Sequence, residues 1–170
     1  DGAILQELFT RDGIGTMISV DSLDNLRPAT IEDVGALLSI IEPLERQGIL
    51  VARPRALIER EIERFFLAEH DGQVIGCAAL YPFPEANKAE LACLAVNPDY
   101  RREGYGERLM KAVERAAKEH GINTLFVLTT RTAAWFTERG FRQATITDLP
   151  EKKQALYNFE RASQVYVKQI

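Results

Sequence analysis

The residues with the clearest chemical signature lie at positions 91–109, LACLAVNPDYRREGYGERL. An apolar run is followed there by Asn-Pro, by a basic segment with Gly104 and Gly106, and then by a helical pattern. Glycine adopts backbone conformations that other residues avoid, and it lets a ligand approach the main chain closely. The amides of such a loop and of the following helix N-terminus attract an anion, so the stretch predicts a phosphate or pyrophosphate site. Positive charge is added by Arg101, Arg102 and Arg108.

Two other glycine-rich phosphate loops fit this stretch poorly. A Walker A loop needs Gly-Lys followed by Ser or Thr, which the stretch lacks, and the dinucleotide fingerprint needs a third Gly where Leu109 stands. The non-functional alternative is a glycine turn before a surface helix. The apolar strand, Pro98 and the arginines together favour the anion site.

The elements that must position this loop alternate along the chain. Asp71-Gly72 predicts a tight hairpin turn between two of the strands. Strands are expected at 26–29, 65–70, 74–81, 90–96, 125–129, 141–147 and 164–168. Helices are expected at 31–41, 55–64, 104–120 and 133–139, the first with Thr30 as N-cap. The third is expected to turn Leu109, Val113 and Ala116 inward and to stop at Gly121. This order predicts an α/β fold with a mixed sheet covered by helices.

Composition narrows the class of protein. The chain has 170 residues, 46% of them hydrophobic, which suits one globular domain with a short appendage. A net charge of −4 argues against a broad nucleic-acid-binding surface. Cys77 and Cys93 stand in no zinc-like spacing with a histidine, so neither a metal site nor a disulfide framework is expected. No run approaches a membrane span of about 20 apolar residues, and we expect a cytoplasmic protein with no membrane partner.

A family resemblance sharpens the anion-site prediction. Residues 101–106, RREGYG, resemble the acyl-CoA pyrophosphate loop (Gln/Arg-x-x-Gly-x-Gly/Ala) of the GNAT superfamily of N-acetyltransferases. The resemblance implies the GNAT fold over 26–170, with acetyl-CoA as cosubstrate and no metal. It implies that the pantetheine arm lies between two splayed parallel strands, 93–96 and 126–129. The cofactor contacts that it implies are Cys93, Leu94, Val96, Arg101, Arg102, Gly104, Tyr105, Gly106 and Glu107.

Several segments resemble one branch of that superfamily more closely. ELACLAV at 90–96, LFVLTTRT at 125–132, WFTERGF at 135–141 and LPEKK at 149–153 are similar to the acetyltransferase domain of bacterial N-acetylglutamate synthases. FTRDGIGT at 9–16 is similar to the end of the amino-acid-kinase-like domain of these enzymes. We therefore expect residues 1–20 to be the remnant of that domain and 21–25 to be a linker. Because the rest of that domain binds arginine in the family and mediates assembly, we expect oligomerisation of the full-length protein and no arginine sensitivity here.

The resemblance also implies roles in acetylating the α-amine of L-glutamate, the first step of arginine biosynthesis, by direct attack in a ternary complex. Glu90 is the expected base, because the amine of glutamate is mostly protonated at neutral pH; Glu85 is the weaker alternative. Many superfamily members use a Tyr as general acid where this chain has Phe136, which cannot donate a proton. The family suggests the hydroxyl of Thr129 instead, although a strand threonine needs no such role.

The resemblance assigns glutamate binding to cationic and polar residues, as two carboxylates require. They are Arg53, Lys153, Arg161 and Ser163, with Arg27 as a spare. Trp135 and Phe141 are expected in the core. Cys93 lies on the acyl-site strand, but a covalent acetyl-cysteine is not favoured, because an apolar strand makes an inert thiol. Two alternatives stay open: an acetyltransferase for another amine, and a non-catalytic module that binds acetyl-CoA.

Overall fold

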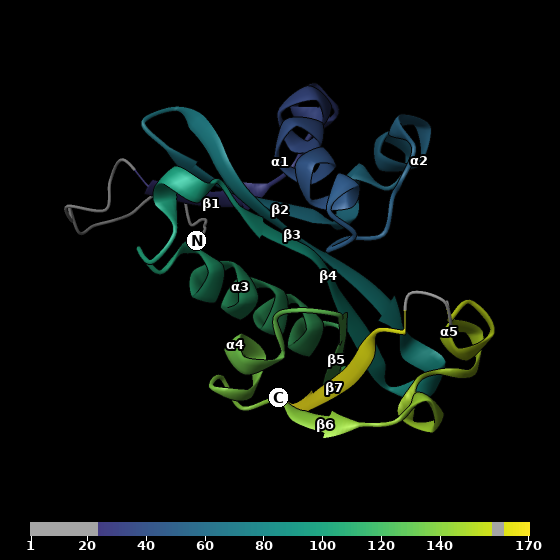
Figure 1. Cartoon of the computed structure of the whole chain (residues 1–170). Coiled ribbons are helices and arrows are strands. Elements are labelled where there is room, and N and C mark those ends of the chain that lie inside the picture. Colours follow the sequence, from purple (N-terminus) through teal and green to yellow (C-terminus); the bar gives the residue numbers. More distant parts are fainter. Residues whose placement is uncertain (1–23, 158–161) are drawn as a thin grey trace.

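A single mixed sheet forms the centre of the protein, whose computed structural model describes residues 24–157 and 162–170 (Figure 1). Its seven strands run in the order β1-β2-β3-β4-β5-β7-β6. They are β1 Asp24–Pro28, β2 Phe65–His70, β3 Gln73–Phe83, β4 Lys88–Val96, β5 Thr124–Thr129, β6 Arg142–Ala144 and β7 Gln164–Gln169. All neighbouring strands are antiparallel except β4 and β5, which are parallel. The predicted mixed α/β architecture is confirmed.

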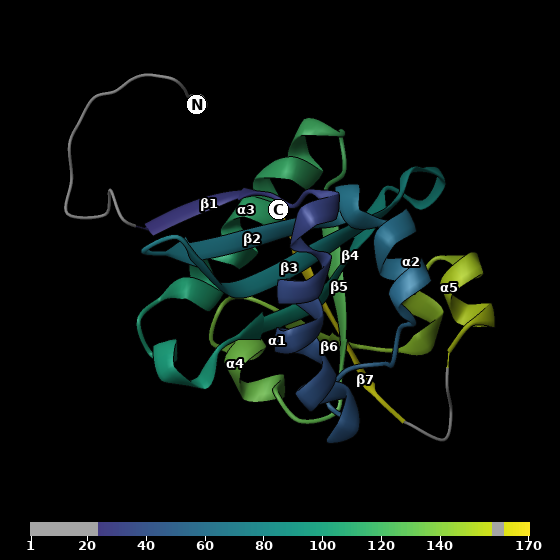
Figure 2. The ribbon, with the colours of Figure 1, turned by 90° about the horizontal axis from the view of Figure 1, so that it is seen from above.

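Helices cover both faces of this sheet. They are α1 Val34–Arg46, α2 Arg55–Arg60, α3 Tyr105–Glu119, α4 Ala133–Thr137 and α5 Glu151–Ala155. Figure 1 shows α1 and α2 on one face and α3 and α4 on the other. Figure 2, seen from above, shows α1 lying across the strands. Loops from the helices of both faces therefore reach the centre of the sheet.

The core of each layer follows from helical spacing. Leu109, Val113 and Ala117 of α3 recur every four residues and are fully buried against the sheet. Ala117 takes the inner position that we expected for Ala116, which is only partly buried. Gly121, at φ +75°, ends the helix as predicted, because its left-handed conformation breaks the helical path.

Local chemistry accounts for the boundaries that differ from expectation. Asp71 and Gly72 have φ of 55° and 81°, as the predicted hairpin turn requires. β6 ends at Ala144 rather than at 147, because the amide of Thr145 donates to Asp148 and begins a 3₁₀ turn. The expected helix 31–41 starts as a 3₁₀ turn, and its α-helical part runs on to Arg46. β1 begins two residues before the expected strand 26–29, and helix α5 was not predicted.

The parallel pair β4–β5 separates soon after it forms. Its register pairs Lys88–Glu90 with Thr124–Phe126 and ends there, although β4 continues to Val96. On its other edge β4 carries a bulge, because the register shifts between Ala92 and Ala95. Cys93, at φ +54°, lies in this bulge. The predicted splayed strands are thus confirmed, and main-chain groups of β4 face the gap.

The part of the chain that the structure describes contains no helix long and apolar enough to cross a membrane. The kinase-like remnant expected at 1–20 lies outside the described residues.

Candidate active site

A cleft of about 580 Å³ opens beside the bulge of β4. It lies between the end of β4, the loop before α3, and α4. Eight of the nine predicted cofactor residues line it, all except Cys93: Leu94, Val96, Arg101, Arg102, Gly104, Tyr105, Gly106 and Glu107. The structure therefore brings the glycine loop and the bulged strand to one cavity.

The two glycines of the loop are required for different reasons. Gly104 is the N-cap of α3 at φ +86°, a left-handed conformation that side chains rarely adopt. A Cβ on Gly106 would lie 3.2 Å from the ring of Trp135, so a larger residue would push the helix and α4 apart. Together they hold the N-terminus of a 15-residue helix open toward the cleft. That end carries a partial positive charge and free amides.

The charged side chains of the loop divide into two groups. Arg101 and Arg102 are exposed, and no carboxylate of a described residue pairs with them. Arg108 instead folds back, with its guanidinium 4.3 Å from the centre of the Tyr105 ring. The Tyr105 ring is buried, so only its main chain is available to an anion. Glu107 lies 3.4 Å from both Lys111 and Arg139. Arg101 and Arg102 are thus the cations free to meet a pyrophosphate.

The opposite wall of the cleft was only partly anticipated. Phe141 is buried in the core as expected, but half-buried Trp135 also lines the cleft. Arg139 stacks 3.9 Å from the centre of the Trp135 ring and donates to its carbonyl oxygen. The four-residue spacing of Trp135 on α4 and Arg139 just beyond its end is a local signal for their stacking, but only the fold places the pair at the cleft. Thr132 begins this wall.

A buried carboxylate lies where β4 and β5 part. Glu90 has a side chain only 8% exposed, and its Oε1 is 2.9 Å from Nζ of Lys153. β4 supplies Glu90, and the unpredicted helix α5 supplies Lys153. Glu85, the alternative base, is exposed on a 3₁₀ turn. Glu90 is therefore sheltered from bulk water, whereas Glu85 is not.

Arg53 completes this cluster from the loop before α2. Its backbone N–H donates to Oε2 of Glu45 at 2.9 Å, and its guanidinium lies 5.8 Å from the centre of the Tyr81 ring. Burial alone would lower the pKa of Arg53, but the nearby Cys93, Tyr81 and Glu90 outweigh it and raise the pKa. Arg53 therefore stays a cation beside Glu90.

The thiol of Cys93 is buried in the same region. Burial raises its pKa to about 11, and Arg53 opposes that shift only partly. A protonated thiol is a weak nucleophile at neutral pH, which supports the expectation of an inert cysteine. The Cys93 carbonyl accepts a weak hydrogen bond from Sγ of Cys77 at 3.2 Å, which helps to hold the bulge.

Other predicted residues have definite places. Thr129 is buried at the end of β5, and Gln164 pairs with it across the sheet, so buried Ser163 lies near that end. Tyr157 donates to the Ser163 carbonyl. Arg161 lies outside the described residues. The expectation for Arg27 as a spare glutamate ligand is wrong: it sits on edge strand β1, paired with Asp33 and Glu69 at 2.8 and 2.9 Å.

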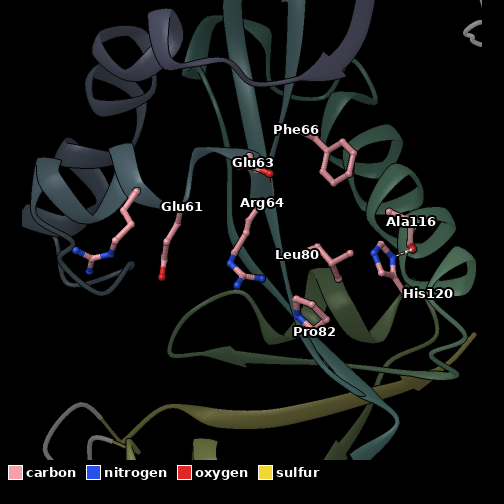
Figure 3. A pocket seen from close by; sticks show the side chains of 9 residues that line it. Glu61, Glu63, Arg64, Phe66, Leu80, Pro82, Ala116 and His120 are labelled. Atoms are coloured by element: carbon pink, nitrogen blue, oxygen red, sulfur yellow. Dashed lines mark hydrogen bonds between the residues drawn. The ribbon is translucent and has the colours of Figure 1, made fainter. Parts of the chain in front are cut away.

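A second cavity, of about 350 Å³, is less suited to chemistry (Figure 3). It lies between the end of α2 and the turn that follows it, the start of β2, the second half of β3 and the end of α3. His120 Nδ1 is held by the carbonyl of Ala116 at 2.8 Å, and Glu61 accepts the hydroxyl of Tyr81 at 2.8 Å. His120 and Glu61 are thus engaged by neighbouring groups of the fold. Among the described residues no cluster of three His, Cys, Asp or Glu side chains could hold a metal ion.

Comparison with known proteins agrees with this geometry. Residues 34–141 match the model of the acetyltransferase (GNAT) family. An amino-acid acetyltransferase of Azotobacter vinelandii is 55% identical over 170 residues, which are 100% of this chain and 39% of that protein. One of Edwardsiella ictaluri is 52% identical over 100% of this chain and 38% of its own length. The chain thus spans about two fifths of these curated relatives.

Solved structures give the same result. N-acetylglutamate synthase of Neisseria gonorrhoeae, complexed with coenzyme A and N-acetyl-glutamate, matches with a TM-score of 0.84 and 45% identity. That match covers 99% of this chain and 40% of the other. The complex of the same enzyme with coenzyme A and L-arginine matches with a TM-score of 0.80 and 44% identity, over 100% of this chain and 38% of the other. Since the family model covers the fold from the start of α1 to Phe141, including the splayed strands and the glycine loop, the chain belongs to the acetyltransferase (GNAT) family.

Proposed function

We propose that this chain transfers the acetyl group of acetyl-CoA to the α-amine of L-glutamate by direct attack in a ternary complex. The observation that carries the proposal is the buried Glu90, held 2.9 Å from Lys153 and close to Arg53, where the parallel strands part. The relatives named as amino-acid acetyltransferases, and the synthase complexed with coenzyme A and N-acetyl-glutamate, support it.

The cleft suits an acyl-CoA along its whole length. Amides at Gly104–Gly106 and the helix N-terminus would hold the pyrophosphate, and Arg101 and Arg102 would neutralise it. Main-chain groups of Cys93, Leu94 and Val96, unpaired toward β5, would hold the pantetheine arm. Acetyl-CoA supplies a thioester whose carbonyl carbon accepts the amine. A bulge amide beside Cys93 would stabilise the oxyanion that forms there.

Glu90 starts the chemistry. Its carboxylate takes a proton from the substrate ammonium, directly or through one water, and frees the lone pair of the amine. The C–N bond then forms as the C–S bond breaks, the electron pair of that bond leaves on the CoA sulfur, and the nitrogen loses its second proton to water in the cleft. Lys153 balances the charge of Glu90, and because an ammonium has three donors it can meet a substrate carboxylate at the same time.

Cations on both sides of Glu90 favour an amino acid with two carboxylates. Arg53 and Lys153 come from different elements, and both lie near the carboxylate of Glu90. A guanidinium can bind a carboxylate through two parallel hydrogen bonds. Glutamine would leave one of these two cations without a substrate carboxylate, and aspartate is one methylene too short to reach both. Arg161 and Ser163 are proposed to add contacts from the loop before β7.

A thiol-release assay with acetyl-CoA and a panel of amines tests the proposal. We expect release with glutamate well above release with glutamine, aspartate or lysine. Arg53→Ala should raise the KM for glutamate at least about tenfold, because a charged hydrogen bond is lost, and should leave the KM for acetyl-CoA nearly unchanged. Arg55→Ala is the matched control, since Arg55 lies two residues away, is exposed and pairs with Glu59. Equal rates with glutamate and glutamine would favour another amine, and binding without turnover would favour a non-catalytic module.

The longer protein is proposed to oligomerise through a kinase-like domain that precedes this one, and to act in the cytoplasm in arginine biosynthesis. Light scattering on the full-length protein, compared with residues 1–170, tests the first point.

A further inference from the structure

Two threonine hydroxyls meet where β5 ends and α4 begins. Oγ1 of Thr129 and Oγ1 of Thr132 are 2.6 Å apart. Oγ1 of Thr129 also accepts the backbone N–H groups of Thr132, at 2.9 Å, and of Arg131, at 3.3 Å. A hydroxyl has two lone pairs and one hydrogen. These two N–H groups occupy both lone pairs of Thr129, which favours the arrangement in which Thr129 donates its hydrogen to Thr132.

The direction of this bond decides which hydroxyl can act on a substrate. Thr132 accepts the hydrogen of Thr129, so its own hydrogen remains available. No acceptor for that hydrogen is present among the described residues. Thr132 is exposed and lines the acyl-CoA cleft, whereas Thr129 is 6% exposed and does not line it. In this arrangement the available donor of the pair belongs to the residue that lines the cleft.

The position of Thr132 on α4 agrees with a role at the sulfur. Its carbonyl accepts the N–H of Phe136, so the two residues lie one helical turn apart on one face. Phe136 also lines the cleft but carries no donor. Thr132 thus brings a hydroxyl to a wall whose aromatic residue has none.

We propose that Thr132 donates a hydrogen bond to the CoA sulfur as the C–S bond breaks, and that Thr129 is a positioning residue that orients it. The electron pair of the broken bond goes to sulfur, and the hydroxyl stabilises the thiolate without losing its proton, because an alcohol is a far weaker acid than a thiol. The thiolate takes its proton from water at the open side of the cleft. This inference rests on the proposed acetyl transfer but not on the identity of the amine.

Steady-state kinetics of valine and serine variants test the donor. Thr132→Val keeps the shape and removes the hydroxyl, and we expect kcat to fall about 10²-fold, as when one donor to a developing anion is removed. Thr132→Ser should restore kcat to within a few-fold, and both should bind acetyl-CoA as the wild type does in calorimetry. Thr137→Val is the matched control, since Thr137 lies on the same helix, is exposed, and donates to the carbonyl of Ala133. Unchanged kcat in Thr132→Val would overturn the proposal.

A second measurement needs no amine and so separates this proposal from the proposed function. The pKa of the thiol in bound CoA is read from thiolate absorbance as the pH is raised. A donor to sulfur favours the thiolate, so we expect this pKa to rise by about one unit in Thr132→Val and to return in Thr132→Ser. If Thr132→Val shows this shift but the wild type does not acetylate glutamate, only the glutamate proposal fails. A shift in Thr129→Val with none in Thr132→Val would show that Thr129 is the donor and overturn the inference.

Discussion

The ion pair between Glu90 and Lys153 gives the sharpest prediction about energetics. Its atoms are 2.9 Å apart, with side chains 8% and 19% exposed. Lys153→Met removes the ammonium and keeps most of the aliphatic packing. It leaves Glu90 in a site that excludes water without its nearest cation. Glu90→Gln removes the opposite charge, and the double variant removes both.

The expected magnitudes follow from burial. Breaking a fully buried pair costs about 3–5 kcal/mol, because an unpaired charge stays in a poorly solvated site. Lys153 retains some access to water and Arg53 lies nearby, so we expect Lys153→Met to lower the free energy of unfolding by about 2–3 kcal/mol. The double variant should lose less than the sum of the single variants, with a coupling energy of about 1–2 kcal/mol.

Urea unfolding at neutral pH, followed by fluorescence, measures all three variants against the wild type. Lys168→Met provides the matched control. Its ammonium lies 2.6 Å from Glu114, with side chains 21% and 15% exposed, on the face of the sheet covered by α3. We expect Lys168→Met to lower stability by a similar amount and leave kcat intact. Glu90→Gln should lower kcat about 10²–10⁴-fold, the range for a positioned proton acceptor.

Additive losses would refute this reasoning. If the single variants and the double variant agree within about 0.5 kcal/mol of additivity, Glu90 and Lys153 do not share an interaction in solution. If Glu90→Gln keeps full activity, the base lies elsewhere, and exposed Glu85 is next to be tested.

Three further predictions concern the loop, the thiol and the sheet edge. Gly104→Val and Gly106→Val should abolish acetyl-CoA binding in calorimetry and leave the circular dichroism spectrum native, because one strains φ +86° and the other meets Trp135; wild-type affinity would contradict this. Cys93, whose pKa burial raises to about 11, should resist alkylation at neutral pH and react as pH nears 11, by mass spectrometry, with urea-unfolded protein as control; rapid labelling of the folded protein would contradict it. The Arg27 guanidinium holds the pKa of Asp33 well below its usual range, so this pair stabilises the fold above about pH 4 and less as pH falls. Arg27→Ala should lower stability by about 1–2 kcal/mol at pH 7 and make it less sensitive to acid, in urea titrations at several pH values; an acid sensitivity equal to that of the wild type would contradict the assignment.

Much of the fold could be predicted because its signals are local. The hairpin at Asp71-Gly72, the apolar run of β4 and the helix stop at Gly121 each depend on a few adjacent residues. The glycine loop is also local, since φ at Gly104 and contact at Gly106 are set within one turn of helix and one neighbour. Helix α5 escaped prediction because five residues show too little of a helical period.

The assembly of the site depends on contacts distant in sequence. Arg27 and Arg53 look alike in sequence, and both are arginines near the start of a helix. Only the strand order places one at an outer edge with Asp33 and the other beside Glu90. Lys153 reaches Glu90 across 63 positions because the chain after β6 folds back past the start of β4.

By itself, then, the sequence determined the mixed α/β class, the glycine loop before α3 and the resemblance to an acyltransferase family. Tertiary structure alone decided that Glu90 is buried and paired, that Trp135 and Arg139 line the cleft, and that the buried hydroxyl of Thr129 meets that of Thr132. The physical reason is the sequence separation between the residues that determine each feature. Turn conformations and helix caps are settled by neighbouring residues, whereas burial, ion pairing and the direction of a hydroxyl's hydrogen depend on every group that the fold packs around it.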